Sequence, residues 1–215
     1  THLLMASKKG MSAMQIGRML DLPYKTAWFL CHRIRFGMTA NHWAEPKLKG
    51  TVEVDETFFG QNPQAPRNRM AIRSMNAIMT MVDRETGRAK SVVIDQVNAT
   101  EIGKILAENL VKEANLRTDE AGHYKAVGKD YADHQFVSHA QDEYVSRLDA
   151  TQHTNTVENY YSVFKRGMKG TYQHAARRHL HRYCAEFDFR YSNRSALGVD
   201  DVSRADRILA GVKGR

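Results

Sequence analysis

Residues 51–60 (TVEVDETFFG) constrain the fold of this chain more than any other segment. Polar and apolar residues alternate along it, as they do in a β-strand whose two faces meet different surroundings. Glu53 and Asp55 share one face of this predicted strand, and Glu56 lies on the other. A buried carboxylate is costly unless it is paired or binds a metal. The position of Asp55 in mid-strand therefore indicates a use for its charge.

The segments that follow predict an α/β fold. A turn of hairpin composition at 83–87 joins two further strand patterns. Three strands, then alternating helix and strand, then helices, indicate a mixed sheet with helices on both faces. Strands are expected at 77–82, 89–97, 115–118 and 135–138, and helices at 100–114 with Thr100 as the cap, from 155, and from 176 onward.

The first 38 or so residues are expected to be helical. Ser12 is placed to cap a helix, Asp21-Leu22-Pro23 interrupts it, and residues 24–35 resume helical periodicity. Two helices joined by a tight break match a helix-turn-helix, whose second helix faces DNA with its first turn. An ordinary helical hairpin is the alternative. We expect residues 41–50 to form a linker.

The organisation expected from these patterns is a small helix-turn-helix-like region at 1–45 and an α/β domain at 46–215. Lys25, Arg33 and Arg35 favour DNA binding by the first region. The formal net charge of +8 also favours a polyanionic partner, most simply nucleic acid.

Residues 153–174 combine an acid with a basic helical face. Glu158, Ser162, Lys165 and Lys169 recur at helical spacing and so share one face. The neighbouring stripe is apolar and consists of Val157, Tyr161 and Phe164. An acid at this seam can reach a metal, while the lysines beyond it can hold a polyanion.

Asp55, Asp119 and Glu158 form the candidate metal site. Asp119 follows a short predicted strand, at the strand end where α/β sheets place their sites. Oxygen-only ligands of this kind suit Mg²⁺ or Mn²⁺. Two such ions, about 3.5–4 Å apart, activate an attacking hydroxyl and stabilise a leaving oxygen. Asn155, on the same helical face as Glu158, is either a further ligand or the cap of the helix.

Other polar residues near these positions have simpler interpretations. Asp130 and Asp133 rival Asp119 but are expected to be solvated acids of a loop. Glu56 is expected to face away from the site as a structural acid. His139 and His153 are interpreted as hydrogen-bonding or phosphate-contacting residues, because a two-metal scheme needs no histidine base.

The basic residues beyond Glu158 are expected to contact DNA phosphates rather than only to solvate a helix face. Tyr172 and His174 either stack on an exposed base or fill a turn. The candidate DNA-binding residues are Lys25, Arg33, Lys165, Arg166, Lys169, Arg177, Arg178 and Arg182, with Arg190 and Arg194 extending the basic region.

Cys31 and Cys184 have no metal-binding spacing, which favours reduced structural thiols in a cytoplasmic protein. No apolar run approaches the roughly 20 residues of a membrane-spanning helix. Because the chain begins at Thr1 rather than Met, we expect the natural protein to begin upstream.

Four segments carry a resemblance to a known family: VEVDETFFG, LRTDEAGHY, FVSHAQDEYV and residues 153–194. They look like the insertion-sequence transposases of the ISXO type, which belong to the DDE superfamily and have a ribonuclease H-like catalytic core. The resemblance implies that Asp55, Asp119 and Glu158 are the first, second and third catalytic acids. Some relatives use an asparagine in the third position, which makes Asn155 a rival. Residues 12–35 resemble the helix-turn-helix region of the family.

The function implied is that of a bacterial DNA transposase with two Mg²⁺ (or Mn²⁺) ions, located in the cytoplasm at the nucleoid. Water would attack at the end of the element, and the freed 3′-hydroxyl would then attack target DNA. The resemblance also implies a homo-oligomer in the synaptic complex with DNA. The alternatives are a non-catalytic or domesticated DNA-binding derivative and a metal-dependent nuclease without strand transfer.

Overall fold

The computed structural model describes the chain except residues 8, 44–45, 65–73, 138–153 and 213–215. The chain forms two compact units. One unit, called here the sheet unit, is Pro46–Tyr161, and the other, called here the helical unit, joins Thr1–Glu45 with Ser162–Arg215. Residues 162–215, which the sequence pattern assigns to the α/β domain, instead group with the N-terminal helices.

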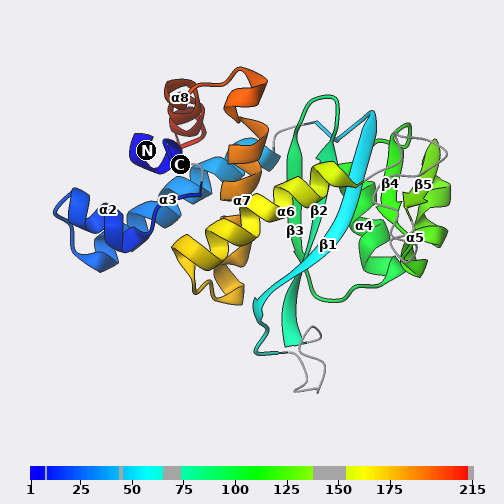
Figure 1. Cartoon of the computed structure of the whole chain (residues 1–215), viewed down its shortest axis with the longest axis horizontal. Coiled ribbons are helices and arrows are strands. Elements are labelled where there is room, and N and C mark those ends of the chain that lie inside the picture. Colours follow the sequence, from blue (N-terminus) through cyan, green and yellow to red (C-terminus); the bar gives the residue numbers. More distant parts are fainter. Residues whose placement is uncertain (8, 44–45, 65–73, 138–153, 213–215) are drawn as a thin grey trace. The chain divides into compact units, whose positions relative to one another are not determined.

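A five-stranded mixed sheet forms the centre of the sheet unit (Figure 1). The strands are β1 (Thr51–Gln61), β2 (Met75–Asp83), β3 (Ala89–Ile94), β4 (Asn115–Asp119) and β5 (Asp133–Val137). Their order is β3-β2-β1-β4-β5, with β1–β2 and β2–β3 antiparallel and β1–β4 and β4–β5 parallel. The mixed sheet that the sequence pattern predicts is therefore confirmed.

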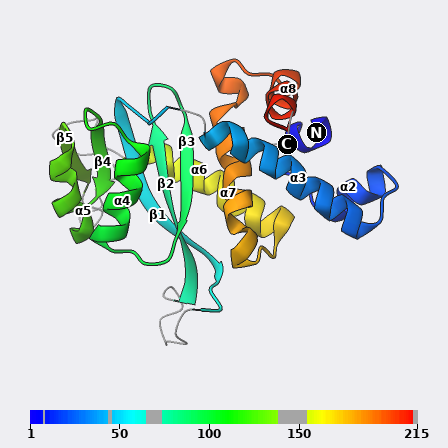
Figure 2. The same ribbon diagram turned by 180° about the vertical axis from the view of Figure 1, so that it is seen from behind.

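The alternation in β1 separates the two faces of the sheet. Val52 and Val54 belong to an apolar core shared with α4 (Ala99–Asn109) and α5 (Gly122–Val127). Glu53 and Asp55 point to the opposite face, where α6 (Asn155–Gly167) begins. Figure 2 shows α4 and α5 in front of the sheet, and Figure 1 shows the start of α6 on the other side. Helices on both faces are therefore confirmed.

Some local predictions differ from the structure. Asn98, not Thr100, caps α4, because its side chain accepts the N–H of Glu101 at 2.9 Å. The helix ends at Asn109, five residues before the expected end at 114, and Leu110 is already extended and bridges to Leu48. At the end of β1, a register shift falls between Phe59 and Gln61.

In the helical unit, Ser12 caps α2 (Ala13–Met19), as predicted. Its side chain accepts the N–H of Gln15 at 3.2 Å. The helix ends in a tight turn in which Asp21 has a φ of 51° and the N–H of Leu22 donates to the carbonyl of Gly17 at 2.8 Å. This pattern is a Schellman motif, with an aspartate in the left-handed position that short polar side chains tolerate.

The second helix, α3 (Tyr24–Trp43), is longer than expected and takes up the first residues of the predicted linker. The remaining helices of the unit are α1 (His2–Met5), the π-helical turn η4 (Met168–Tyr172), α7 (Arg177–Ser192), the short η5 (Ser195–Leu197) and α8 (Asp201–Val212). Their apolar core draws on residues from both ends of the chain, namely Leu4, Met5, Ile16, Cys31, Ile34, Met38, Phe189 and Ile208. This shared core explains why the C-terminal helices join the N-terminal ones.

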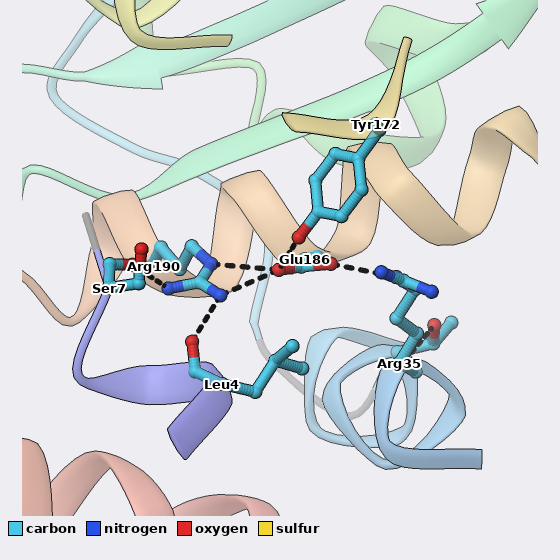
Figure 3. Close-up of polar contacts among 7 residues, drawn as sticks. Leu4, Ser7, Arg35, Tyr172, Glu186 and Arg190 are labelled. Carbon is cyan, nitrogen blue, oxygen red and sulfur yellow. Dashed lines mark hydrogen bonds and ion pairs between the residues drawn. The ribbon is translucent and has the colours of Figure 1, made fainter. Parts of the chain in front are cut away.

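A buried ionic cluster reinforces the helical unit (Figure 3). Glu186 on α7 accepts hydrogen bonds from Arg35 at 2.7 Å, from Arg190 at 2.6 Å and from the hydroxyl of Tyr172 at 2.6 Å. Arg190 also donates to the carbonyls of residues in and after α1. Although burial alone would raise the pKa of Glu186, the two arginines lower it to about 2.

This cluster corrects two expectations and decides between the two alternatives for Tyr172. Arg35 and Arg190 were interpreted as part of the DNA-binding surface, but both are buried ion-pair partners. Tyr172 fills the core of the helical unit, with its ring 4.9 Å from that of Tyr183, so it is not placed to stack on a base.

Candidate active site

Two parallel strands bring Asp55 and Asp119 together. In the pairing of β1 with β4, Thr51 lies opposite Asn115 and Glu53 opposite Arg117. Two residues further along both strands are Asp55 and Asp119, and the period of two places them on one face. Asp119 is the last residue of β4, and its carboxylate accepts the N–H of Ala121 at 3.0 Å.

Two contacts attach α6 to the same face of β1. Oε2 of Glu53 accepts the backbone N–H groups of Thr156 at 2.8 Å and Val157 at 2.9 Å. One turn later, the Tyr161 hydroxyl donates to the backbone carbonyl of Asp55 at 2.5 Å. Glu158 lies between these anchors, in the first turn of the helix.

The side chain of Glu158 is itself oriented. The hydroxyl of Thr154 donates to its Oε1 at 3.1 Å. Asn155, expected to cap the helix, is instead its first residue, and the N–H of Val157 in the first turn goes to Glu53. The capping interpretation of Asn155 was therefore wrong, because a carboxylate from β1 takes that place.

Crowded negative charge perturbs Asp55. Burial, and after it the carboxylates of Glu56, Asp119 and Glu158, together raise the pKa of Asp55 to about 7, against the N–H of Glu56, which donates to Asp55 at 2.8 Å. Because Asp119 and Glu158 both raise the pKa of Asp55, the three acids predicted from the sequence lie close enough for their charges to interact. A cation bound among them would relieve this repulsion.

The donor set matches the chemistry of a hard divalent cation. Asp55, Asp119 and Glu158 offer only carboxylate oxygens, the ligands that Mg²⁺ and Mn²⁺ prefer. Each carboxylate commits one oxygen to a local hydrogen bond. Within the described ranges, no three His, Cys, Asp or Glu side chains are gathered closely enough to hold an ion. The three acids are thus neighbours whose side chains do not yet converge.

Glu56 faces away from this site, as expected. Its carboxylate accepts the Tyr124 hydroxyl at 2.5 Å and lies 3.4 Å from Nε2 of His123. The Glu56 carboxylate raises the pKa of His123, and Asp119 adds a smaller increase. His123 and Tyr124 lie at the start of α5, directly after Asp119 in the chain.

The rival acids have ordinary surroundings. Asp130 is 67% exposed and lies 3.7 Å from Lys112, and Asp133 pairs with Arg117 at 3.0 Å. Asp130 is therefore a surface acid, as expected, whereas Asp133 is the half-buried first residue of β5 and the partner of a largely buried arginine. His139 and His153 lie outside the described residues.

Glu53 and Tyr161 are parts of the site that the sequence pattern does not reveal. Glu53 was recognised as sharing a face with Asp55, and that was the available signal. Its partners lie more than 100 residues away, at 156 and 157, so local pattern did not reveal the contact.

The remaining candidate cations belong to the helical unit. Lys25, Arg33, Lys165, Arg166, Lys169 and Arg178 are exposed, and Arg177 and Arg182 are half-buried. Arg33 lies over the ring of Phe36 at 5.9 Å, and Arg194 covers the ring of Tyr191 at 4.1 Å. Among the described helices, none is both long and apolar enough to span a bilayer.

Comparison with known proteins identifies one family. Residues 47–192 match the ISXO2-like transposase domain, which covers about two thirds of the chain. No match was found among curated proteins.

Two solved structures show a weaker likeness. The first, an intasome of simian T-cell lymphotropic virus in complex with the PP2A regulatory subunit B56 gamma, has 10% identity and a TM-score of 0.40 over 66% of this chain and 48% of that one. The second, the HTLV-2 integrase catalytic core domain in complex with magnesium, has 6% identity and a TM-score of 0.38 over 66% and 84%. The chain thus spans about half the length of the first structure, and the family assignment does not depend on either.

Proposed function

Because the chain belongs to the ISXO2-like transposase domain family of the DDE superfamily, we propose that it is a DNA transposase that cuts at the ends of an insertion sequence and joins them to target DNA. The observation that supports this most is the common neighbourhood of Asp55 on β1, Asp119 on β4 and Glu158 on α6, at one face of the sheet. Three acids from two parallel strands and a helix are the ligand set that such chemistry requires.

Asp55, Asp119 and Glu158 would hold two Mg²⁺ or Mn²⁺ ions. When bound, the ions supply an activated oxygen nucleophile and stabilise the leaving oxygen of the phosphodiester. The protein orients the acids: the Ala121 N–H fixes Asp119, and the Thr154 hydroxyl fixes Glu158. No side-chain nucleophile is needed, because water attacks first and the released 3′-hydroxyl attacks next.

The exposed cations of the helical unit would hold DNA phosphates. Lys165 and Arg166 follow Glu158 on α6, and Lys169 lies in the π-helical turn after it. Lys25 at the start of α3 and Arg33 further along are exposed in the manner that a helix-turn-helix requires. We assign the active complex, formed with DNA in a bacterial cytoplasm, to a homo-oligomer, because joining requires two ends to be held together.

A cut-and-join assay tests this function. DNA carrying a labelled element end is incubated with Mg²⁺ or Mn²⁺ and a target plasmid. Asp55→Asn, Asp119→Asn and Glu158→Gln are each expected to abolish both cutting and joining while DNA binding is retained. Asp130→Asn is the matched control, because this acid is exposed and is expected to leave activity unchanged. Metal-dependent cutting by Asp55→Asn would refute the assignment, and cutting without joined product would indicate a nuclease.

A further inference from the structure

We propose that Glu53 is a positioning residue of this site, which fixes the first turn of α6, and with it Glu158, against the strand that carries Asp55. The inference rests on the proposed function, since it concerns the same acids. Glu53 itself is not a ligand in this proposal. Its carboxylate is consumed by the contacts that hold the helix.

The contacts of Glu53 leave little freedom. The side chain is 0% exposed, and its two oxygens face different partners. Oε2 accepts the N–H groups of Thr156 and Val157, and Oε1 accepts Nε of Arg84 at 2.6 Å. Arg84 is 17% exposed and is held in turn by its N–H, which donates to the carbonyl of Thr51 at 3.0 Å. Arg84 therefore orients the carboxylate through Oε1, and Oε2 binds the first turn of α6.

A helix normally begins with backbone N–H groups that lack partners, and a nearby side chain of its own segment caps them. Here the cap comes from the sheet, so satisfying the helix terminus also fixes where the terminus lies. The negative charge adds a favourable interaction with the helix dipole. Because Glu158 directly follows Val157, its backbone position is set within the same turn.

A second contact, from Tyr161, allows a positioning role of Glu53 to be distinguished from a role in stability alone. The Tyr161 hydroxyl holds the next turn of α6 to the Asp55 carbonyl and does not involve Glu53. Loss of the Glu53 charge should therefore loosen the first turn while the helix stays attached. The third acid is then presented less accurately, and the affinity for metal falls.

The test compares Glu53→Gln with a matched control, Glu101→Gln. Glu101 also accepts two backbone N–H groups, those of Asp95 and Gln96, each at 2.8 Å, but it does so at the start of α4. Both variants lose one charged acceptor of two backbone N–H groups, but only Glu53 is fully buried and ion-paired, so the folding of each variant is checked by circular dichroism. Mn²⁺ binding is measured by electron paramagnetic resonance on the full chain, alongside the Mn²⁺ concentration that gives half-maximal DNA cutting.

For Glu53→Gln we expect both Mn²⁺ values to rise by about tenfold or more, as for other residues that support metal ligands. Glu101→Gln should match the unchanged protein. Equal Mn²⁺ values for Glu53→Gln and the unchanged protein would overturn the proposal. If Glu53→Gln does not fold, as judged by circular dichroism, Arg84→Gln replaces it. It should shift the Mn²⁺ values in the same direction by less, and no shift would be decisive against the proposal.

Asp55→Asn is included to separate the two claims. If it still cuts DNA with Mn²⁺, the proposed function fails. If it is inactive while Glu53→Gln binds Mn²⁺ normally, only the role of Glu53 fails.

Discussion

Replacing Asp55 with Asn should make the metal-free protein more stable at neutral and alkaline pH, although it destroys the proposed site. Asn keeps an oxygen that can accept the Glu56 N–H and removes only the charge. In the folded protein, burial and the carboxylates of Glu56, Asp119 and Glu158 raise the pKa of Asp55 from 3.8 to about 7. The folded state therefore retains a proton that the unfolded chain has already lost.

The sign follows from proton linkage. Between pH 4 and pH 7 the folded state binds more protons than the unfolded state, so stability falls as the pH rises through this range and is flat above it. A pKa difference from 3.8 to about 7, at about 1.4 kcal/mol for each pH unit, corresponds to ~4 kcal/mol. Since Asp55 is only partly shielded from water, we expect the gain for Asp55→Asn at pH 8 to be about 2–4 kcal/mol.

Urea denaturation in EDTA, followed by circular dichroism at pH 4 and pH 8, measures this difference. Asp55→Asn should match the unchanged protein at pH 4 and exceed it at pH 8. Addition of Mn²⁺ at pH 8 should stabilise the unchanged protein and not the variant. A variant that is equally stable or less stable at pH 8, or that differs by the same amount at both pH values, would refute the reasoning.

Two further predictions concern the helical unit. Glu186→Gln should lower the free energy of unfolding by about 3–5 kcal/mol, because Arg35 and Arg190 are left buried without their counter-charge. Urea denaturation at pH 7 measures this change. A loss under about 1 kcal/mol would contradict the prediction. Since the pKa of Glu186 is lowered to about 2, its contribution should be complete above about pH 4.5 and be lost as the pH falls toward 2. The double substitution Lys165→Ala and Lys169→Ala should weaken DNA binding at every sequence and reduce the slope of log affinity against log salt by about 2, roughly 0.9 for each lost phosphate contact. Filter binding at several salt concentrations tests this, and an unchanged slope would exclude these lysines from the interface.

The sequence predicted those parts of the fold that depend on local pattern. The alternation at 51–60 fixed which side chains of β1 share a face, and the turn composition at 83–87 predicted the β2–β3 hairpin. The Ser12 cap was also readable, because its partner lies three residues away. Each of these rests on neighbours within a few residues.

What the sequence did not predict depends on distant partners. From the local sequence, Arg35 cannot be told apart from an arginine that binds DNA. It is buried because it pairs with Glu186, which lies 151 residues further along the chain. The Asn155 cap failed for the same reason, since Glu53 reaches the helix from the sheet. The grouping of 162–215 with the first helices likewise follows from a core built from both chain ends.

The alternation of β1 also sets how the gene for this protein can vary in length. Asp55 and Glu56 face opposite sides of the sheet, and pairing to β2 holds both in place. Deleting one codon between 51 and 54 would shift the register by one residue. Asp55 would then face α4 and α5, and Glu56 would take its place on the face where α6 begins. The shift after Phe59 shows where the strand already accommodates an irregular step. Length changes among natural variants should therefore collect after that residue.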